Sequence, residues 1–302
     1  MKLEICLQIE APKVFFELFN INKHYQLVDN PNINKSAIIK VLLGDNVNVS
    51  WEETSKELSI TCIKIDNSVL EMVNTMINAL FIRELEYRKI YMLHASCVYS
   101  KKNNKFLVLF GDSGAGKTTV MLDLIKKYNL NYVSNGATLI QEQSCGFKVI
   151  GSYKKGIKLR STSIKEYDSN LFHTYFKNVS SLEKKEVSPL DLKLPIHNHY
   201  NNVSTNCSLY FIKLSQSPFL INKNKNYRIS MILYNDIARH IKFSDYYTEI
   251  NNYPVFIPSL DSEELFTCRI KFINNFLNKN FCGFIHGNLV DTIDYIGEKH
   301  DL

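Results

Sequence analysis

The chain lacks the cysteine spacing of a secreted, disulfide-stabilised protein. Its seven cysteines stand far apart, and none belongs to a C-x-x-C pair. An odd and scattered set in a chain of 302 residues is typical of reduced thiols. We therefore expect a cytoplasmic protein.

Long hydrophobic runs and clustered basic residues are also missing. No stretch reaches the roughly eighteen apolar residues of a transmembrane helix, and residues 1–5 carry neither the apolar core nor the cleavage site of a signal peptide. The net charge is +6, but the lysines are spread through the chain and form no basic arm or arginine stripe. The composition therefore predicts a soluble protein with no membrane and no nucleic-acid partner.

What the chain does contain is one glycine-rich motif. Residues 111–119 read Gly-Asp-Ser-Gly-Ala-Gly-Lys-Thr-Thr and match the pattern G-x-x-x-x-G-K-[ST] throughout. The apolar run 106–110 before the motif predicts a buried strand, and apolar residues at helical spacing over 120–125 predict a helix after it. Strand, glycine loop and helix are the context of a phosphate-binding loop.

The residue types of this motif suit a nucleoside triphosphate. The glycines permit backbone conformations in which consecutive N–H groups turn toward an anion, and the helix start adds its positive dipole end. Lys117 would bind the outer phosphates, and the Thr118 hydroxyl would ligate magnesium. The motif predicts binding of ATP or GTP with Mg²⁺. The expected cofactor-binding residues are Gly111, Asp112, Ser113, Gly114, Ala115, Gly116, Lys117, Thr118 and Thr119.

The residues before the motif predict a separate small domain. Short strands are predicted at 3–7, 37–42 and 58–63. From Ser68 to about Ile90 the apolar residues recur at spacings of three and four, which predicts an amphipathic helix. We expect an α+β N-terminal recognition domain over 1–85, followed by a nucleotide-binding catalytic domain over 86–302.

The second domain opens with a predicted hairpin. A strand over 91–99 and the strand 106–110 are joined by the polar turn 101–104, so the two strands must pair antiparallel. Most phosphate-loop enzymes surround the second of these strands with parallel neighbours. Residues 162–200 are expected to be helix and loop, with His197 and His199 on the surface. Further strands are predicted at 132–134, 137–141, 147–151, 208–214, 229–233 and 255–258, with a helix over 262–277.

His94-Ala-Ser-Cys-Val, the hairpin and the loop 111–118 together resemble the catalytic domain of the HPr kinase/phosphorylase family. The resemblance is clearest between about residues 83 and 160. It implies an α/β fold with a mixed-sheet P-loop core of the HPr-kinase/PEP-carboxykinase type, preceded here by the small α+β domain. It also implies an ATP- and Mg²⁺-dependent phosphotransferase that acts on a protein or peptide serine or on a small molecule. Because the family includes hexamers, a homo-oligomer is possible.

The resemblance assigns roles to individual residues. Lys117 and Thr118 match the phosphate and magnesium positions, and His94 matches the active-site histidine, although a histidine on an apolar strand is equally well read as part of the core. Arg160 could reach a transferring phosphoryl group, with Lys158 as a substitute. Alternatively, the two are a solvated surface pair.

The chain departs from the family at Ser134-Asn135-Gly136, where an acidic pair is usual. Asn135 can ligate magnesium through its amide oxygen but cannot act as a general base. Glu142 is a possible replacement for the missing acid, whereas Asp112 lies inside the loop and is not assigned that role. Phosphoryl transfer depends largely on positioning and charge neutralisation, so loss of the base need not abolish it. The predicted catalytic residues are His94, Lys117, Asn135 and Arg160, and the predicted metal ligands are Thr118 and Asn135.

Three functions remain open from the sequence. The first is a kinase that phosphorylates a hydroxyl of a small metabolite or of a peptide or protein serine, such as a serine of a ribosomally made precursor peptide. The second, suggested by Asn135-Gly136, is a nucleotide-binding regulatory or scaffold protein without phosphotransfer. The third is an ordinary parallel-sheet NTPase, which would have a parallel strand in place of the hairpin.

Overall fold

The computed structural model describes residues 5–21, 36–144, 146–152, 156–161, 173, 176, 183–197, 206–217, 219–222, 227–243 and 247–302. The chain forms two compact units: Met1–Lys89 with Ile237–Arg269, and Ile90–Asp236 with Ile270–Leu302. The sequence predicts a single boundary near residue 85, whereas the contacts group 237–269 with the N-terminal residues. No helix in the described ranges has both the length and the hydropathy that crossing a bilayer requires.

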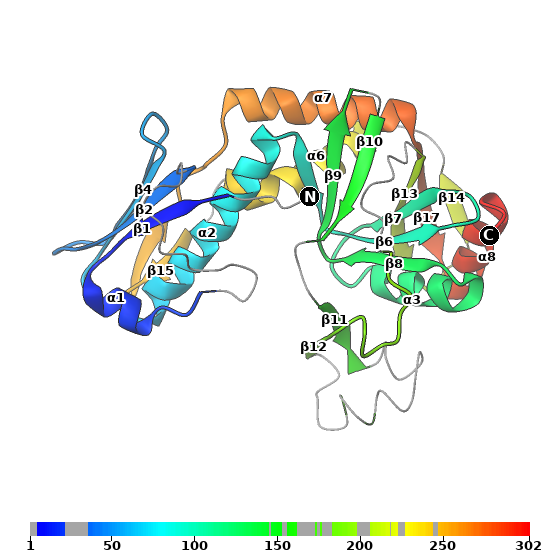
Figure 1. Cartoon of the computed structure of the whole chain (residues 1–302), viewed down its shortest axis with the longest axis horizontal. Coiled ribbons are helices and arrows are strands. Elements are labelled where there is room, and N and C mark those ends of the chain that lie inside the picture. Colours follow the sequence, from blue (N-terminus) through cyan, green and yellow to red (C-terminus); the bar gives the residue numbers. More distant parts are fainter. Residues whose placement is uncertain are drawn as a thin grey trace. The chain divides into compact units, whose positions relative to one another are not determined.

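The first unit is built on a four-stranded sheet in the order β1-β2-β4-β3. Strands β1, β2 and β4 run parallel, and β3 pairs antiparallel with β4. Helix α2 lies beside this sheet (Figure 1). The elements of this unit are β1 (Leu7–Glu10), α1 (Lys13–Leu18), β2 (Ala37–Leu43), β3 (Asn48–Glu52), β4 (Glu57–Cys62), α2 (Asn67–Tyr87), β15 (Tyr247–Ile250) and β16 (Tyr253–Phe256).

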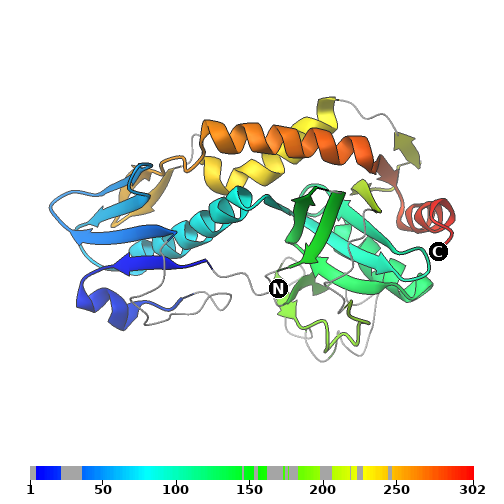
Figure 2. The ribbon, with the colours of Figure 1, turned by 45° about the horizontal axis from the view of Figure 1, so that its top comes forward.

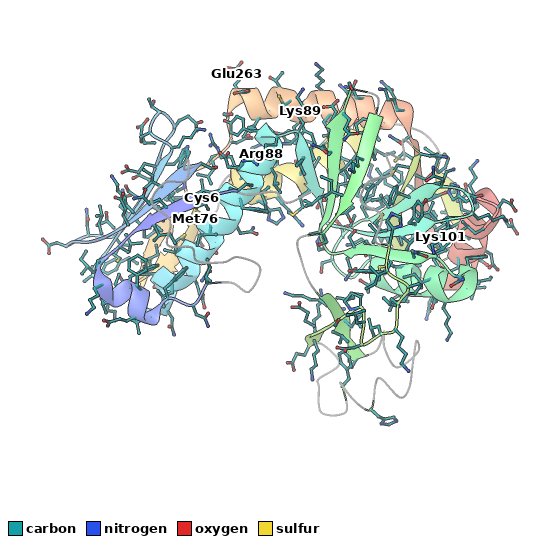
Figure 3. All side chains as sticks on the ribbon, viewed as in Figure 1. Cys6, Met76, Arg88, Lys89, Lys101 and Glu263 are labelled. Carbon is teal, nitrogen blue, oxygen red and sulfur yellow. The ribbon has the colours of Figure 1, made fainter. Side chains whose placement is uncertain are left out.

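Helix α2 has a clear start and a long buried face. The Asp66 carboxylate accepts hydrogen bonds from the backbone N–H groups of Ser68 (3.0 Å) and Val69 (3.4 Å), which satisfies two of the free donors at the helix start. The helix ends at Tyr87, and Figure 3 labels the next two residues, Arg88 and Lys89. The predicted amphipathic helix over 68–90 is therefore confirmed, apart from its last turn.

Two fully buried arginines explain why residues 237–269 belong to the first unit. Arg83 on α2 donates from Nε to the Leu260 carbonyl at 2.9 Å. Arg269 donates from Nε to Glu86 of α2 at 2.8 Å and from Nη2 to Asp261 at 2.7 Å. A buried charge is costly unless it is paired, so these bonds hold the late segment on the N-terminal helix.

The second unit contains a six-stranded sheet in the order β14-β17-β13-β7-β6-β8. Strands β7, β13 and β17 run parallel, whereas β6 pairs antiparallel with both β7 and β8. The predicted hairpin is present, and Figure 3 labels Lys101 in its turn. The mixed α/β character is confirmed, and the parallel-sheet alternative is not supported. These strands are β6 (Ala95–Ser100), β7 (Lys105–Phe110), β8 (Asn131–Asn135), β13 (Cys207–Leu214), β14 (Leu220–Asn222) and β17 (Phe281–Gly287).

The predicted strand over 91–99 is two strands. Strand β5 (Ile90–Leu93) belongs to a three-stranded sheet with β9 (Thr138–Gln143) and β10 (Gly146–Gly151), and β6 begins at Ala95. His94 is the residue at which the chain passes from one sheet to the other. A continuous apolar run cannot reveal such a crossing, because both strands are buried.

Helices α3 (Lys117–Tyr128) and α8 (Leu289–Lys299) pack on each other and on the six-stranded sheet. Figure 2 shows α8 in red, directly after β17. One hydrophobic cluster joins β6, β7 and β13 to the two helices through Val98, Leu107, Tyr210, Leu124 and Ile296. This packing fixes the start of α3 against the end of β7.

Two further expectations were wrong. Residues 229–233, predicted as a strand, lie in helix α6 (Tyr227–Lys242). The buried residues Ile229, Leu233, Ile237 and Ile241 follow every four positions, a helical period that a five-residue window misses. His197, expected on the surface, is buried against the rings of Tyr99 and Phe106. His199 and most of 162–182 lie outside the described residues.

Buried His300 gives the second unit a predicted sensitivity to acid. The Lys105 ammonium lies 3.3 Å from Nδ1, so Nδ1 accepts and Nε2 donates to Tyr210 Oη at 2.6 Å. Burial, followed by the charges of Lys105 and Lys299, lowers the pKa of His300 from 6.5 to about 4. The unfolded chain therefore binds the proton more readily between these values, and stability falls as the pH falls.

Between pH 7 and pH 5 this residue alone should cost about 2 kcal/mol of unfolding free energy. Urea unfolding of the full chain at the two pH values measures the loss. In His300→Gln the difference should shrink by that amount, whereas in His173→Gln, a change at an exposed position, it should not. Equal pH dependence in all three proteins would contradict the assignment.

Candidate functional site

The glycine loop joins the end of β7 to the start of α3. Gly111, Gly114 and Gly116 have φ values of 146°, 86° and 94°, a region that favours glycine. Gly116 is the N-cap of α3, and its carbonyl accepts the Val120 N–H at 3.0 Å. The loop therefore ends at a helix N-terminus, where free N–H groups and the helix dipole favour an anion.

The three glycines have different surroundings. A Cβ on Gly111 would lie 2.6 Å from the Ile212 carbonyl oxygen, and one on Gly116 would lie 2.4 Å from the Leu214 side chain. At these two glycines the loop packs closely on β13. The backbone N–H of Leu214, the last residue of β13, also donates to the Ala115 carbonyl of the loop at 3.0 Å. A Cβ on Gly114 would meet nothing within 4 Å. The loop is thus fixed on one side and open at Gly114.

Lys117 is held inside the loop. Its Nζ donates to the carbonyl oxygens of Gly111 at 2.6 Å and Asp112 at 2.9 Å, and the side chain is buried. An ammonium bound to neutral carbonyls keeps its full charge, and a phosphate is a stronger acceptor than a carbonyl. The lysine is therefore placed to exchange these carbonyls for the oxygens of a bound phosphate.

Thr118 meets the end of β8 at Asn135. The Thr118 hydroxyl donates to Asn135 Oδ1 at 3.1 Å, and Ser96 on β6 donates to the same oxygen at 2.6 Å. Asn135 and Ser96 are buried. The structure thus brings together the two predicted metal ligands, and it adds Ser96, which the sequence did not single out.

His94 lies beside this group. Its Nδ1 is 3.0 Å from the carbonyl oxygen of Gly136, the residue after Asn135. Because a carbonyl can only accept, Nδ1 carries the hydrogen, and in the neutral ring Nε2 is the basic nitrogen. The His94 backbone N–H donates to Asp236 Oδ2 at 2.7 Å. Both the main chain and the ring of His94 are therefore anchored.

Strand register places His94 at the mouth of the loop. Ala95 pairs with Phe110, so His94 and Gly111 follow at the same end of two neighbouring strands. On the other side Ser96 pairs with Asn135. His94, Gly111 and the Asn135-Gly136 turn therefore lie at the same end of the neighbouring strands β7, β6 and β8.

Asp236 on α6 is the site residue that the sequence missed. Its contact with His94 spans 142 positions, and neither residue lies in a motif with the other. No pattern within the chain could have joined them, because only the packing of α6 brings them together.

The remaining predicted acids and bases lie elsewhere in the described contacts. Arg160 ends β11 (Ile157–Arg160), which pairs with β12 (Lys184–Val187), and no described contact joins Arg160 or Lys158 to the loop. Glu142 accepts a hydrogen bond from Asn275 at 2.9 Å. Thr138, the first residue of β9, follows Asn135-Gly136-Ala137, and Glu142 lies four residues further on. At the rise of a β-strand this places Glu142 about 13 Å along the strand from Thr138. The catalytic role of Arg160 stays a prediction.

The donor set fits a metal ion that arrives with a nucleotide. Within the described ranges no group of three or more His, Cys, Asp or Glu side chains could hold an ion by itself. Thr118 and Asn135 offer two hard oxygen atoms beside an open phosphate loop. Mg²⁺ is usually bound by one or two carboxylates together with phosphates and water, whereas this pair offers two neutral oxygens and no carboxylate.

Comparisons with known proteins add little to this geometry. No protein-family model matches the chain, and no curated protein matches it. One solved structure, described as the Hpr(Ser) kinase/phosphatase from Coxiella burnetii, aligns with 70% of this chain and 99% of its own, at 12% identity and a TM-score of 0.23. A likeness this distant supports no functional conclusion, so the functional argument rests on the residues of the site.

Proposed function

We propose that the protein is an ATP- and Mg²⁺-dependent kinase that transfers the γ-phosphoryl group to a hydroxyl. The observation that carries the proposal is the joining of the open phosphate loop to Asn135 through Thr118. It brings the glycine loop, two side-chain oxygens and His94 to the same end of neighbouring strands, which supports a phosphate site there. The acceptor is a peptide or protein serine, such as that of a precursor peptide, or a small metabolite, and the N-terminal unit recognises it.

The chain's own residues supply binding and orientation. Backbone N–H groups of the loop and the start of α3 would hold the phosphates, and Lys117 would neutralise the charge that develops as the γ-phosphoryl group moves. Thr118 and Asn135 would hold Mg²⁺. When bound, this ion would offset the negative charge of the phosphates. A buried loop lysine is more effective here than an exposed one, because less water screens it.

A second function is favoured by one observation. Asn135 Oδ1 already accepts two hydroxyl hydrogen bonds, and no acidic residue follows it in Asn135-Gly136-Ala137. A protein that binds nucleotide for regulation or as a scaffold needs no base and no tight metal site. In that case nucleotide binds and no phosphate moves.

Following the γ-phosphate separates the two functions. The full chain is incubated with Mg²⁺ and γ-labelled ATP, and label is measured in free phosphate, in the protein and in a synthetic serine peptide. The kinase proposal predicts that label leaves ATP and that ADP appears in equal amount. If Mg·ATP raises the melting temperature but the label stays in ATP, the kinase proposal is wrong and the scaffold function is supported.

A further inference from the structure

We propose that His94 Nε2 takes the proton from the acceptor hydroxyl. This inference rests on the proposed kinase function and identifies the general base that the site otherwise lacks. Its starting point is the ring geometry. The bond between Nδ1 and the Gly136 carbonyl, at 3.0 Å, sets the tautomer in which Nε2 holds the lone pair.

The other candidate bases near the loop are less suitable. Asn135 has no basic atom, and its Oδ1 is engaged by Ser96 and Thr118. Asp236 binds the His94 main chain with Oδ2. Glu142 is bound to Asn275, well along β9. Asp112 is exposed and lies in the loop that would bind the phosphates. An ionised Asp112 would therefore bring a negative charge close to the negatively charged phosphates.

The surroundings of His94 suit an incoming hydroxyl. Gly136, which fixes the ring, has a φ of 75°, and a Cβ there would meet nothing within 4 Å. His94 itself is half-buried. This part of the site therefore combines a fixed imidazole with open space beside the mouth of the phosphate loop. The charged group that contacts His94 is Asp236 on α6, which accepts the His94 backbone N–H at 2.7 Å.

The step balances without a further reactant. The acceptor O–H bond breaks and its proton goes to Nε2, while the oxygen forms a bond to the γ-phosphorus. The bond between this phosphorus and the β–γ bridging oxygen breaks, and ADP leaves with the electron pair. His94 is then an imidazolium, with hydrogens on both nitrogens, and returns its proton to solvent before the next turnover.

The test uses His94→Asn, because an asparagine amide can still donate to the Gly136 carbonyl but supplies no base. Hydrolysis of Mg·ATP by the full chain, with water as the acceptor, is measured from pH 5.5 to 8.5. We expect the wild-type rate to rise with pH, because only a neutral imidazole can take the proton. In His94→Asn the rate should fall about 10²- to 10⁴-fold and lose this rise, while ATP affinity and melting temperature stay unchanged.

His94→Gln serves as the second variant, since its amide reaches the position of Nε2 and also lacks basicity. It should be as slow as His94→Asn. If wild type turns over and His94→Asn keeps its rate and pH profile, the histidine is structural and this inference is wrong, although the kinase proposal survives. If wild type binds ATP but shows neither hydrolysis nor transfer, the kinase proposal fails, and the base assignment fails with it.

Discussion

Replacing Lys117 by methionine should lower the rate of phosphate transfer by about 10² to 10³ and weaken ATP binding by more than tenfold. The side chain is buried, and its Nζ already lies within the loop, 2.6 Å from the Gly111 carbonyl. Methionine keeps the apolar stem of lysine and removes the ammonium, with its charge and its two hydrogen bonds to the loop carbonyls. Fold and packing should therefore persist while the phosphates lose their cation. Calorimetric titration with Mg·ATP and the label assay measure the two effects.

Lys126→Met is the matched control, because Lys126 is an exposed residue in the last turn of the same helix. It should bind and turn over as wild type does. AMP should bind Lys117→Met and wild type alike, since it lacks the outer phosphates. Equal ATP affinity in Lys117→Met and wild type would show that the nucleotide does not occupy this loop.

Replacing Asn135 by aspartate should lower the Mg²⁺ concentration for half-maximal activity by about tenfold or more, because a carboxylate is a far better magnesium ligand than an amide. Aspartate keeps the oxygen that accepts from Ser96 and Thr118, so the local hydrogen bonds remain. Without metal, the new charge is buried and should lower the melting temperature of the ligand-free protein. Saturating Mg·ATP should restore it.

Ser96→Ala separates the change in the Mg²⁺ requirement from a change in the stability of the fold around Asn135. It removes one donor to Asn135 but no metal oxygen, so it should change stability and leave the Mg²⁺ requirement as in wild type. If Asn135→Asp binds ATP normally and needs as much Mg²⁺ as wild type, residue 135 does not face the metal ion.

Local features of this chain could be predicted from its sequence. The glycine loop between a strand and a helix, the antiparallel hairpin before it and helix α2 are each encoded within about twenty neighbouring residues, by a motif or by apolar spacing. Helix α6 could not be recognised from residues 229–233 alone, because its helical period emerges only over about four turns.

Contacts between distant segments could not be predicted. The bond between Asp236 and His94 depends on where α6 packs, and the break between β5 and β6 depends on the passage of the chain from one sheet to another. The buried arginines that fix 237–269 on α2 resemble ordinary surface charges in the sequence. One sequence alone does not indicate such contacts, because neither partner belongs to a local motif or an unusual sequence pattern.

A crystal structure of the full chain with Mg²⁺ and a non-hydrolysable ATP analogue tests the central claim most directly. We predict that the triphosphate lies in the loop at Gly114, that Lys117 Nζ leaves the Gly111 and Asp112 carbonyls for the β- and γ-phosphates, and that Thr118 ligates the metal. The γ-phosphorus should lie on the side of His94. An analogue bound away from 111–119, or a loop lysine still on its carbonyls with the analogue present, would contradict the account.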